Sequence, residues 1–294
     1  MTIPFSDPPW IALPSPYYNQ SHRRWQKTCR AFIEENLLVN AMEWDKEETL
    51  PDSVFKKFAE NNMLLPALPA PLPVQWLKKL GIHDILGVVK VEEWDYFHTA
   101  IFFDEVCNSL VSDGSIMRAE VWLVLQMHRS GLAGPPASIT AGPNFGIPPI
   151  LNFGSKQLQD KYLPELLLGK KRSCIAITEP SAGSDVANIQ TTAKKSSDGK
   201  YYIINGTKKW ITTGIWTDYS TMAVRTGGPG AGGLSMMVVP LKNYPGVTMY
   251  RLKVQGQTSG GTSFIELDDV KVPVENLIGQ EGMGMKVCIS LSLL

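Results

Sequence analysis

A short loop rich in oxygen-bearing side chains is the first stretch of the chain that could carry chemistry. Residues 174–177 form an apolar, β-branched run that predicts a strand, and Pro180 and Gly183 then break it. Thr178 and Ser184 lie in this break. Such a loop turns tightly and presents hydroxyls and backbone N–H groups to an electron-rich edge, such as a carbonyl, a ring nitrogen or a phosphate. Taken alone, the same composition also fits an ordinary hairpin loop.

A second stretch, around Asn205-Gly206, predicts a hairpin with an aromatic platform on its outgoing strand. Asn-Gly between two β-rich runs is a strong hairpin signal, so we expect the chain to turn there. Because side chains alternate along a strand, Trp210 and Thr212 share one face and Ile211 takes the other. A flat aromatic ring beside a hydroxyl suits a flat heteroaromatic ligand, although a tryptophan in the core of a sheet would show the same pattern.

Together the two stretches resemble the acyl-CoA dehydrogenase family. The motifs that carry the resemblance are Thr178-Glu179-Pro180, Ala182-Gly183-Ser184-Asp185, Asn205-Gly206, Lys208, Trp210-Ile211-Thr212, Asp268-Asp269-Val270-Lys271-Val272-Pro273, Glu275-Asn276-Leu277-Ile278-Gly279 and Gly282-Met283-Gly284. Upstream, the segment from Gly154-Ser155 to Pro164 resembles the family's helix before the first flavin loop. The resemblance covers residues 149–287 closely and the region before them weakly.

The resemblance implies FAD as cofactor and an acyl-CoA thioester as substrate. The implied cofactor-binding residues are Ile175, Ile177, Thr178, Ser184, Trp210, Ile211 and Thr212. By the family pattern, Ile177 and Thr178 contact the pyrimidine side of the flavin, Trp210 packs against the ring system, and Thr212 lies near N5. Ser184 resembles the residue at which the cofactor and acyl-CoA sites meet, so it is also the implied substrate-binding residue.

The reaction implied by the resemblance is α,β-dehydrogenation: a carboxylate removes the α-proton while the β-hydrogen leaves as hydride to the flavin. In the family that carboxylate comes from a third, helical domain, of which residues 285–294 would be a truncated start. Glu179 is the carboxylate nearest the loop, but the family uses it structurally, so no catalytic residue is assigned. We therefore expect no turnover by this chain. Ile175 stands where other members have an aromatic residue, which leaves the acyl group open.

Alternative functions remain open from the sequence. The chain is either the first two domains of a dehydrogenase of fatty-acid or branched-chain catabolism, or a truncated, non-catalytic paralogue that binds FAD, acyl-CoA or a related subunit. An acyl-CoA oxidase-like member is a further alternative. The electron acceptor is accordingly an electron-transfer flavoprotein or oxygen, and the complete protein is expected to be a homo-oligomer.

Composition excludes several classes of protein. Over 294 residues the formal net charge is +0, which argues against a nucleic-acid surface because phosphate binding needs concentrated Lys and Arg. The 4 cysteines are scattered, as in a reducing compartment, and the 4 histidines show no metal-ligand spacing, so no metal is expected. No apolar run approaches the roughly 20 residues of a membrane helix. No targeting signal is clear, so we expect an intracellular protein, cytoplasmic, mitochondrial or peroxisomal.

The fold class expected is α+β, with an all-α N-terminal domain over residues 1–173, beginning with a Pro-rich arm at 1–20. An antiparallel β-barrel or sandwich follows over residues 174–284. We expect helices from His22 with Ser21 as cap, from Pro51, from Asp95 to Leu110, and from Ser155 to just before Pro164. Strands are expected at 174–177, 187–194, 201–204, 207–213, 219–225, 234–240, 247–254 and 263–272. His98, inside one helix, is given no role.

Segments 121–142 and 288–294 interrupt the family pattern sharply. Both lack the helix that the family would place there. We therefore hypothesise that both are errors of exon assignment.

Overall fold

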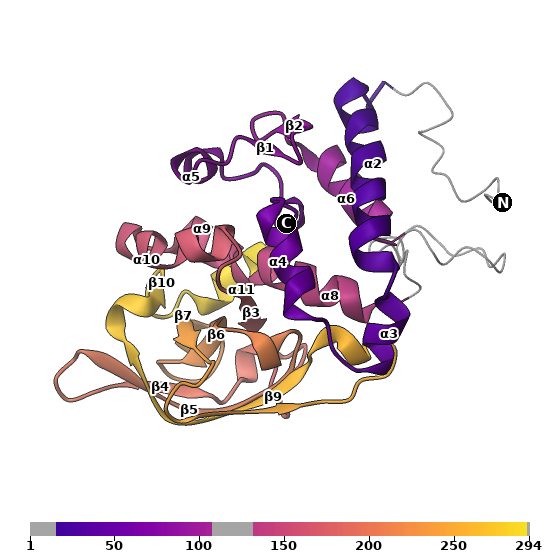
Figure 1. Ribbon diagram of the computed structural model, residues 1–294. Helices are drawn as coiled ribbons and strands as arrows, with labels where there is room; N and C mark the ends of the chain where they lie inside the picture. The colour runs from indigo at the N-terminus through magenta and orange to yellow at the C-terminus, as the bar shows by residue number, and fades with distance from the viewer. Residues whose placement is uncertain (1–15, 108–131, 293–294) are drawn as a thin grey trace. The chain divides into compact units, whose positions relative to one another are not determined.

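The computed structural model describes residues 16–107 and 132–292. The chain forms two compact units, residues 1–139 with 256–260 and residues 140–255 with 261–294 (Figure 1). The domain ranges expected from the sequence, 1–173 and 174–284, stay a prediction, because compact units and family domains divide a chain by different criteria. No described helix has the length and apolar character needed to cross a membrane.

The first unit is mainly helical. Its elements are α2 (Gln20–Ile33), η1 (Glu34–Leu38), α3 (Ala41–Lys46), α4 (Asp52–Glu60), η2 (Leu65–Ala67), α5 (Val74–Lys79), β1 (Asp84–Ile85), β2 (Val89–Lys90), α6 (Tyr96–Cys107), the greater part of α8 (Gly134–Ala141) and η8 (Thr258–Gly260). The antiparallel pair of β1 and β2 corrects the all-α expectation in this one place.

The spacing of apolar residues correctly predicted the buried face of α2. Trp25, Cys29 and Ile33 are all 0% exposed, as residues three and four positions apart on one helical face should be. The predicted cap is wrong, because Asn19 and not Ser21 caps the helix. The Asn19 side chain accepts hydrogen bonds from two backbone N–H groups of the first turn.

The second unit is an 8-stranded sheet with helices packed on it. Its elements are η4 (Gly142–Gly146), α9 (Pro148–Phe153), α10 (Lys156–Leu167), β3 (Ser173–Ala176), η5 (Val186–Asn188), β4 (Thr192–Lys195), β5 (Tyr201–Ile211), η6 (Gly214–Trp216), β6 (Tyr219–Arg225), η7 (Ala231–Gly233), β7 (Leu234–Pro240), β8 (Val247–Arg251), β9 (Ser263–Pro273), η9 (Val274–Asn276), β10 (Leu277–Ile278) and α11 (Gly284–Ser292). The fold class is confirmed: helices precede a β-sheet region that contains no α-helix between residues 187 and 272.

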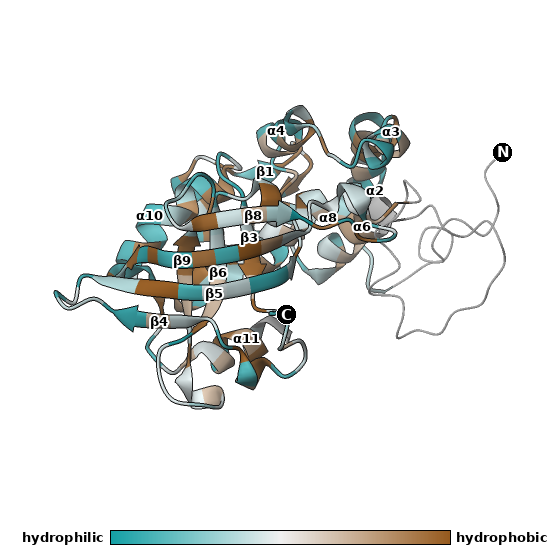
Figure 2. Ribbon diagram, turned by 90° about the horizontal axis from the view of Figure 1, so that it is seen from below, coloured by the Kyte–Doolittle hydropathy of each residue, from teal (hydrophilic) through white to brown (hydrophobic). Residues whose placement is uncertain are grey.

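The sheet runs in the order β10-β7-β6-β4-β5-β9-β8, and β3 pairs with β6 outside this path. The edge strands β10 and β8 do not pair, so the described strands form no closed barrel. Two pairings, β3 with β6 and β4 with β6, are parallel, whereas the sequence predicted only antiparallel ones. Hydrophobic and hydrophilic residues alternate along the strands in Figure 2, as expected of strands with one buried face.

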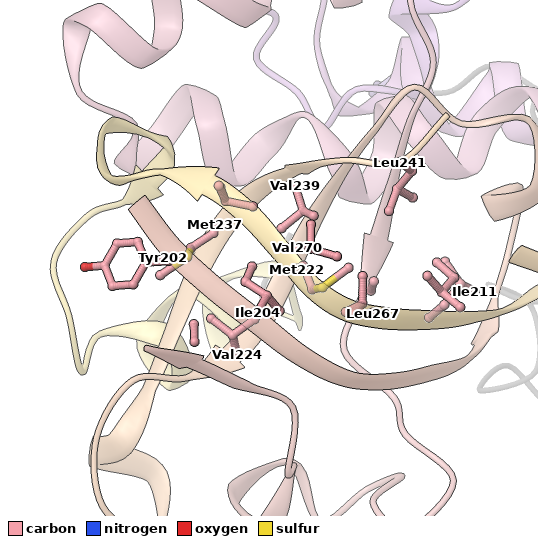
Figure 3. Packing of buried hydrophobic residues seen from close by; sticks show 14 of the residues in the cluster. Tyr202, Ile204, Ile211, Met222, Val224, Met237, Val239, Leu241, Leu267 and Val270 are labelled. Atoms are coloured by element: carbon pink, nitrogen blue, oxygen red, sulfur yellow. The ribbon is translucent and has the colours of Figure 1, made fainter. Parts of the chain in front are cut away.

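The buried core of the second unit is a hydrophobic cluster inside the curved sheet (Figure 3). Its members are Cys174, Ala176, Ala193, Tyr202, Ile204, Ile211, Met222, Val224, Met237, Val239, Leu241, Ile265, Leu267, Val270 and Val272. These residues come from six strands and the residue after β7, so the two halves of the sheet share one core. This core packs against β3 and β5, and the candidate site lies at the ends of these two strands.

The expected hairpin at Asn205-Gly206 is wrong, because β5 passes through both residues as one strand. The pairing of β5 with β9 shifts register here, and the Asn205 amide exchanges two hydrogen bonds of 2.9 Å with Asp269. Gly206 has φ of 145°, and a Cβ on it would lie 2.6 Å from Thr191 Oγ1. The glycine therefore serves a bulge and a close approach of the segment just before β4 instead of a turn.

Three helix predictions also need correction. α10 does not stop before Pro164 but contains it, because Leu163, Leu166 and Leu167 around it are buried. α8 occupies the end of segment 121–142, whose residues 121–131 lie outside the described part, and α11 includes residues 288–292. The statement that these segments lack a helix is wrong, and the hypothesis of exon errors loses that support.

Candidate flavin and substrate site

The candidate site begins where β3 ends. β3 lies parallel to β6, with Ser173 opposite Tyr219 and Ala176 opposite Met222. Cys174 and Ala176 are buried in the core, whereas Ile175 and Ile177 are half-buried. This alternation directs the two isoleucines away from the core cluster, on the side expected for ligand contacts.

A backbone hydrogen bond joins the loop after β3 to the end of β5. The Lys209 N–H donates to the carbonyl of Thr178 over 2.9 Å. Thr178 is therefore next to the strand that carries Trp210, although the two residues are far apart in sequence. The structure thus brings together the two stretches that the sequence marked separately as candidate ligand contacts.

The rest of the loop is a tight turn. Glu179 and Ala182 exchange two backbone hydrogen bonds, of 3.0 and 3.2 Å. The turn exposes Pro180, Ser181 and Ser184 while Glu179 and Ala182 are buried. Ser184 is thus accessible to a ligand, and its predicted role at the meeting point of two sites stays a prediction.

Trp210 is held outward by an unusual backbone. Its φ is 62°, in the left-handed region, at a register shift between β5 and β9. The side chain is 52% exposed, and the Lys209 ammonium lies 4.7 Å from its ring centre. A bulky residue at positive φ is uncommon and concentrates at ligand sites. The ring is accordingly available to a ligand instead of belonging to the core.

Ile211 and Thr212 differ in burial as predicted, but the cause is different. Ile211 is 2% exposed and belongs to the core, whereas Thr212 is half-buried. β5 ends at Ile211, so strand alternation does not by itself place Trp210 and Thr212 on one face. The bulge at Trp210 decides where the two side chains point.

A buried ion pair beneath the loop was missed by the sequence analysis as a site feature. Lys208 Nζ lies 2.7 Å from Glu179 Oε1, with the two side chains 0% and 3% exposed. Burial raises the pKa of Glu179, but Lys208 and hydrogen bonds from Thr191 and Gln190 outweigh it, so the pKa lies below its usual range. Burial lowers the pKa of Lys208 to about 8, and Glu179 opposes that shift. A lysine at a core-facing position of a strand was the available sequence signal.

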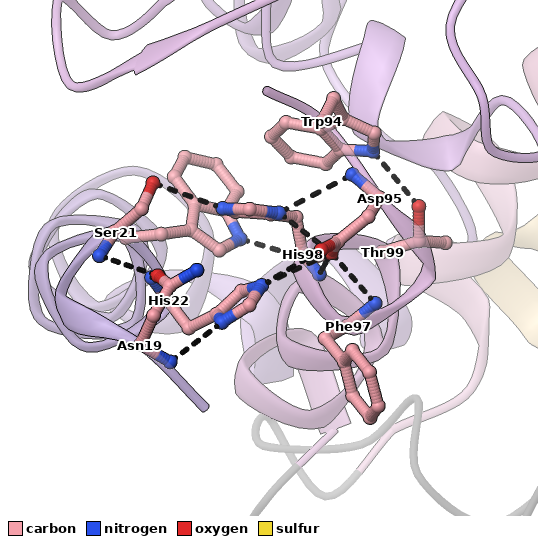
Figure 4. Close-up of polar contacts among 9 residues, drawn as sticks. Asn19, Ser21, His22, Trp94, Asp95, Phe97, His98 and Thr99 are labelled. Carbon is pink, nitrogen blue, oxygen red and sulfur yellow. Dashed lines mark hydrogen bonds and ion pairs between the residues drawn. The ribbon is translucent and has the colours of Figure 1, made fainter. Parts of the chain in front are cut away.

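A second polar cluster lies in the first unit, far from the loop in sequence (Figure 4). His22, Asp95 and His98 place potential ligand atoms within 4.8 Å of one another. His22 Nδ1 accepts from the Asn19 N–H over 3.0 Å, so neutral His22 carries its proton on Nε2, which donates to Asp95 over 3.0 Å. This nitrogen therefore has no lone pair for a metal.

Asp95 makes the cluster a capping device. Its carboxylate accepts from the N–H groups of Phe97 and His98 at the start of α6 and from His22 Nε2, and it lies 2.8 Å from His98 Nδ1. His98 also contacts the Ser21 hydroxyl over 3.1 Å. No role was predicted for His98 from the sequence, and in the structure it joins the first turns of α2 and α6. The expectation of no metal stays a prediction.

Comparisons with known proteins agree with this geometry. Residues 174–270 match the acyl-CoA dehydrogenase middle domain, and residues 19–132 match the acyl-CoA dehydrogenase N-terminal domain. The chain belongs to the acyl-CoA dehydrogenase family. The resemblance drawn from the sequence motifs is therefore confirmed.

Relatives and solved structures give the extent of the likeness. The chain is 67% identical over 290 residues to Acyl-CoA dehydrogenase apdG of Emericella nidulans, covering 98% of this chain and 61% of that protein. It is 29% identical to the mitochondrial short-chain specific acyl-CoA dehydrogenase of Rattus norvegicus, covering 92% of this chain and 56% of that protein. The chain thus spans 56% to 61% of the length of these curated relatives.

Two solved structures resemble this one closely. An acyl-CoA dehydrogenase from Geobacillus kaustophilus matches with a TM-score of 0.72 and 29% identity, over 95% of this chain and 63% of that chain. One from Bacillus anthracis, complexed with FAD, matches with a TM-score of 0.73 and 26% identity, over 96% of this chain and 42% of that chain.

Proposed function

We propose that this chain is part of an FAD-dependent acyl-CoA dehydrogenase, an oxidoreductase that introduces an α,β double bond into an acyl-CoA thioester. The observation that carries the proposal is the hydrogen bond from Lys209 N–H to the Thr178 carbonyl. It sets the Thr178 loop beside a half-exposed Trp210. Family membership supports the same reaction class.

The residues present fit a flavin. Trp210 offers an aromatic face that is 52% exposed, and the half-buried side chains of Ile175 and Ile177 offer apolar contact at the end of β3. Hydroxyls of Thr178 and Thr212 supply hydrogen-bond partners for the polar edges of such a ring. When bound, the flavin supplies the hydride acceptor.

The contribution of this chain is orientation of the bound groups. Ile177, Thr178, Trp210 and Thr212 hold the cofactor side, and exposed Ser184 contacts the acyl-CoA. Glu179 is not a base for the α-proton, because its carboxylate accepts from Gln190 N–H, Thr191 N–H and Lys208, and these contacts hold its pKa low. A general base must accept a proton within hydrogen-bond reach of its substrate.

The partners follow from the reaction class. We propose an acyl-CoA as the substrate, an electron-transfer flavoprotein or oxygen as the acceptor, and a homo-oligomer for the complete protein inside the cell. Anaerobic reduction followed by addition of either acceptor identifies which of them reoxidises the flavin.

The test uses residues 1–294, reconstituted with FAD, and two variants. Trp210→Ala should bind FAD more weakly than the wild type, since a lost aromatic contact typically costs on the order of 1 kcal/mol beyond buried area. Tyr250→Ala is the matched control, because Tyr250 is 51% exposed on β8 and has no assigned ligand role. Equal flavin content in all three proteins would contradict the proposed cofactor site.

Acyl-CoA binding is then read from the visible spectrum of the bound flavin. Under anaerobic conditions, acyl-CoAs of several chain lengths should perturb the spectrum at stoichiometric concentration. A spectrum that no acyl-CoA changes would contradict the substrate class while leaving the cofactor assignment standing.

A further inference from the structure

Lys208 places a buried charge directly beneath the candidate flavin loop. It is 0% exposed, and its ammonium donates to the Ile177 carbonyl over 3.0 Å and to Glu179 Oε1 over 2.7 Å. Glu179 in turn accepts from Gln190 N–H over 2.6 Å and Thr191 N–H over 3.0 Å. One buried pair therefore joins the residue before Thr178, the turn that leads to Ser184, and the chain entering β4.

A contribution to stability does not by itself explain why this charged pair is buried. Burying two charges costs free energy that their attraction often fails to recover, so well-packed apolar residues serve a core as well or better. The positions joined by this pair, however, are loop backbone groups that an apolar side chain cannot hold. The geometry thus favours a role in shaping the loop.

We propose that Lys208 is a positioning residue, which acts through Glu179 and the Ile177 carbonyl to hold loop 177–191 in the conformation that presents Thr178 and Ser184 to the ligands. The proposal rests on the proposed function only for the identity of those ligands. The tether itself is a property of this chain and can be tested without cofactor.

Among the described residues, two titratable groups act on the Lys208 ammonium, Glu179 from the loop and Cys288 from α11. Burial raises the pKa of Cys288 to about 11, so this thiol is neutral at ordinary pH. Burial lowers the pKa of Lys208 to about 8 from its ordinary value of 10.5. The folded protein therefore binds fewer protons than the unfolded chain between these values, and stability should rise with pH there while the charged tether is lost. Raising the pH through this range should therefore increase the stability of the whole fold but weaken the hold of Lys208 on the loop.

The experiment compares loop protection with global stability. Amide hydrogen exchange is measured over residues 177–191 and over β6–β7 as an internal reference, and melting temperature is measured in parallel. The variants are Lys208→Met, Lys208→Met with Glu179→Gln, and Lys194→Met, an exposed lysine of β4 that serves as the control.

Lys208→Met should raise exchange in loop 177–191 and lower the melting temperature, because it leaves Glu179 buried without its counter-charge. In the double variant no charge is left buried, so the melting temperature should recover while the loop still exchanges about 10- to 100-fold faster than in wild type. Lys194→Met should change neither. FAD affinity should follow loop exchange and not melting temperature.

Loop protection that returns with the melting temperature in the double variant would overturn the proposal, as would unchanged exchange in Lys208→Met. Wild-type chain that fails to bind FAD would contradict the proposed function instead. Because hydrogen exchange needs no FAD, the two failures are distinguishable.

Discussion

Gly206 is the position at which a single methyl group should test the description of β5. Its φ of 145° is one that L side chains rarely adopt, and an alanine Cβ there would lie 2.6 Å from Thr191 Oγ1 and 2.7 Å from Thr191 Cα. Gly206→Ala therefore combines backbone strain with a clash against the backbone of a neighbouring segment.

The expected cost has two parts. Backbone strain at such a φ costs about 1–3 kcal/mol, and overpacking of a tight contact typically costs about 1–3 kcal/mol more. We expect Gly206→Ala to lower the free energy of unfolding of the second unit by about 2–6 kcal/mol. Gly199→Ala isolates the first part, because Gly199 has φ of 69° but no heavy atom within 4 Å of the added Cβ.

Urea unfolding of both variants measures the difference. Displacement of Thr191 should also disturb Glu179, which accepts from the Thr191 N–H, so Gly206→Ala should weaken FAD binding whereas Gly199→Ala should not. Equal stability losses in the two variants would refute the close contact. A wild-type-like Gly206→Ala would contradict both the strained backbone and the close contact with Thr191.

Three further predictions address other parts of the chain. Asn19→Ala should destabilise the first unit by about 0.5–2 kcal/mol through loss of the α2 cap, measured by thermal unfolding. The control is Asn61→Ala, at the C-terminal end of α4, where no N-cap is lost. The first unit should become less stable as pH drops below about 6.5. Burial holds the pKa of His98 below its ordinary 6.5, so the unfolded chain binds more protons there than the folded one. A free energy of unfolding that stays constant from pH 7 to 5 would contradict this. Lys161→Met should destabilise the second unit by no more than about 1 kcal/mol, since Lys161 is exposed and its ammonium donates to the neutral Asn276 side chain, and a larger loss on denaturation would contradict that.

Local sequence signals predicted elements well where packing and local preference agree. β6 and β7 begin and end at the predicted residues because apolar runs are bounded there by turn-forming residues. The candidate loop and Trp210 were found from motif and composition. Their contact was expected from the resemblance, and the Lys209–Thr178 hydrogen bond now supplies the physical basis for it.

Signals failed where a distant segment changed the local preference. Asn205-Gly206 is a strong turn sequence, yet pairing with β9 and the approach of Thr191 keep β5 extended. Pro164 lies inside α10 because the helix face around it is buried, which outweighs the lost hydrogen bond. In both places the local residues favour a turn or a helix end, and packing with distant segments contributes more free energy than that local preference.

The sequence by itself determined the family, the order of helices then strands, the buried face of α2 and the residue types in the candidate loop. Each of these depends on residue types over a few turns or strands, which local spacing records. Only the tertiary structure decided that Lys208 and Glu179 pair beneath the loop, that His22 and His98 share Asp95, and that Trp210 points outward. Lys208 and Glu179 are 29 positions apart, His22 and Asp95 are 73 positions apart, and the direction of Trp210 depends on a strand register. Local spacing records neither such distances nor the register.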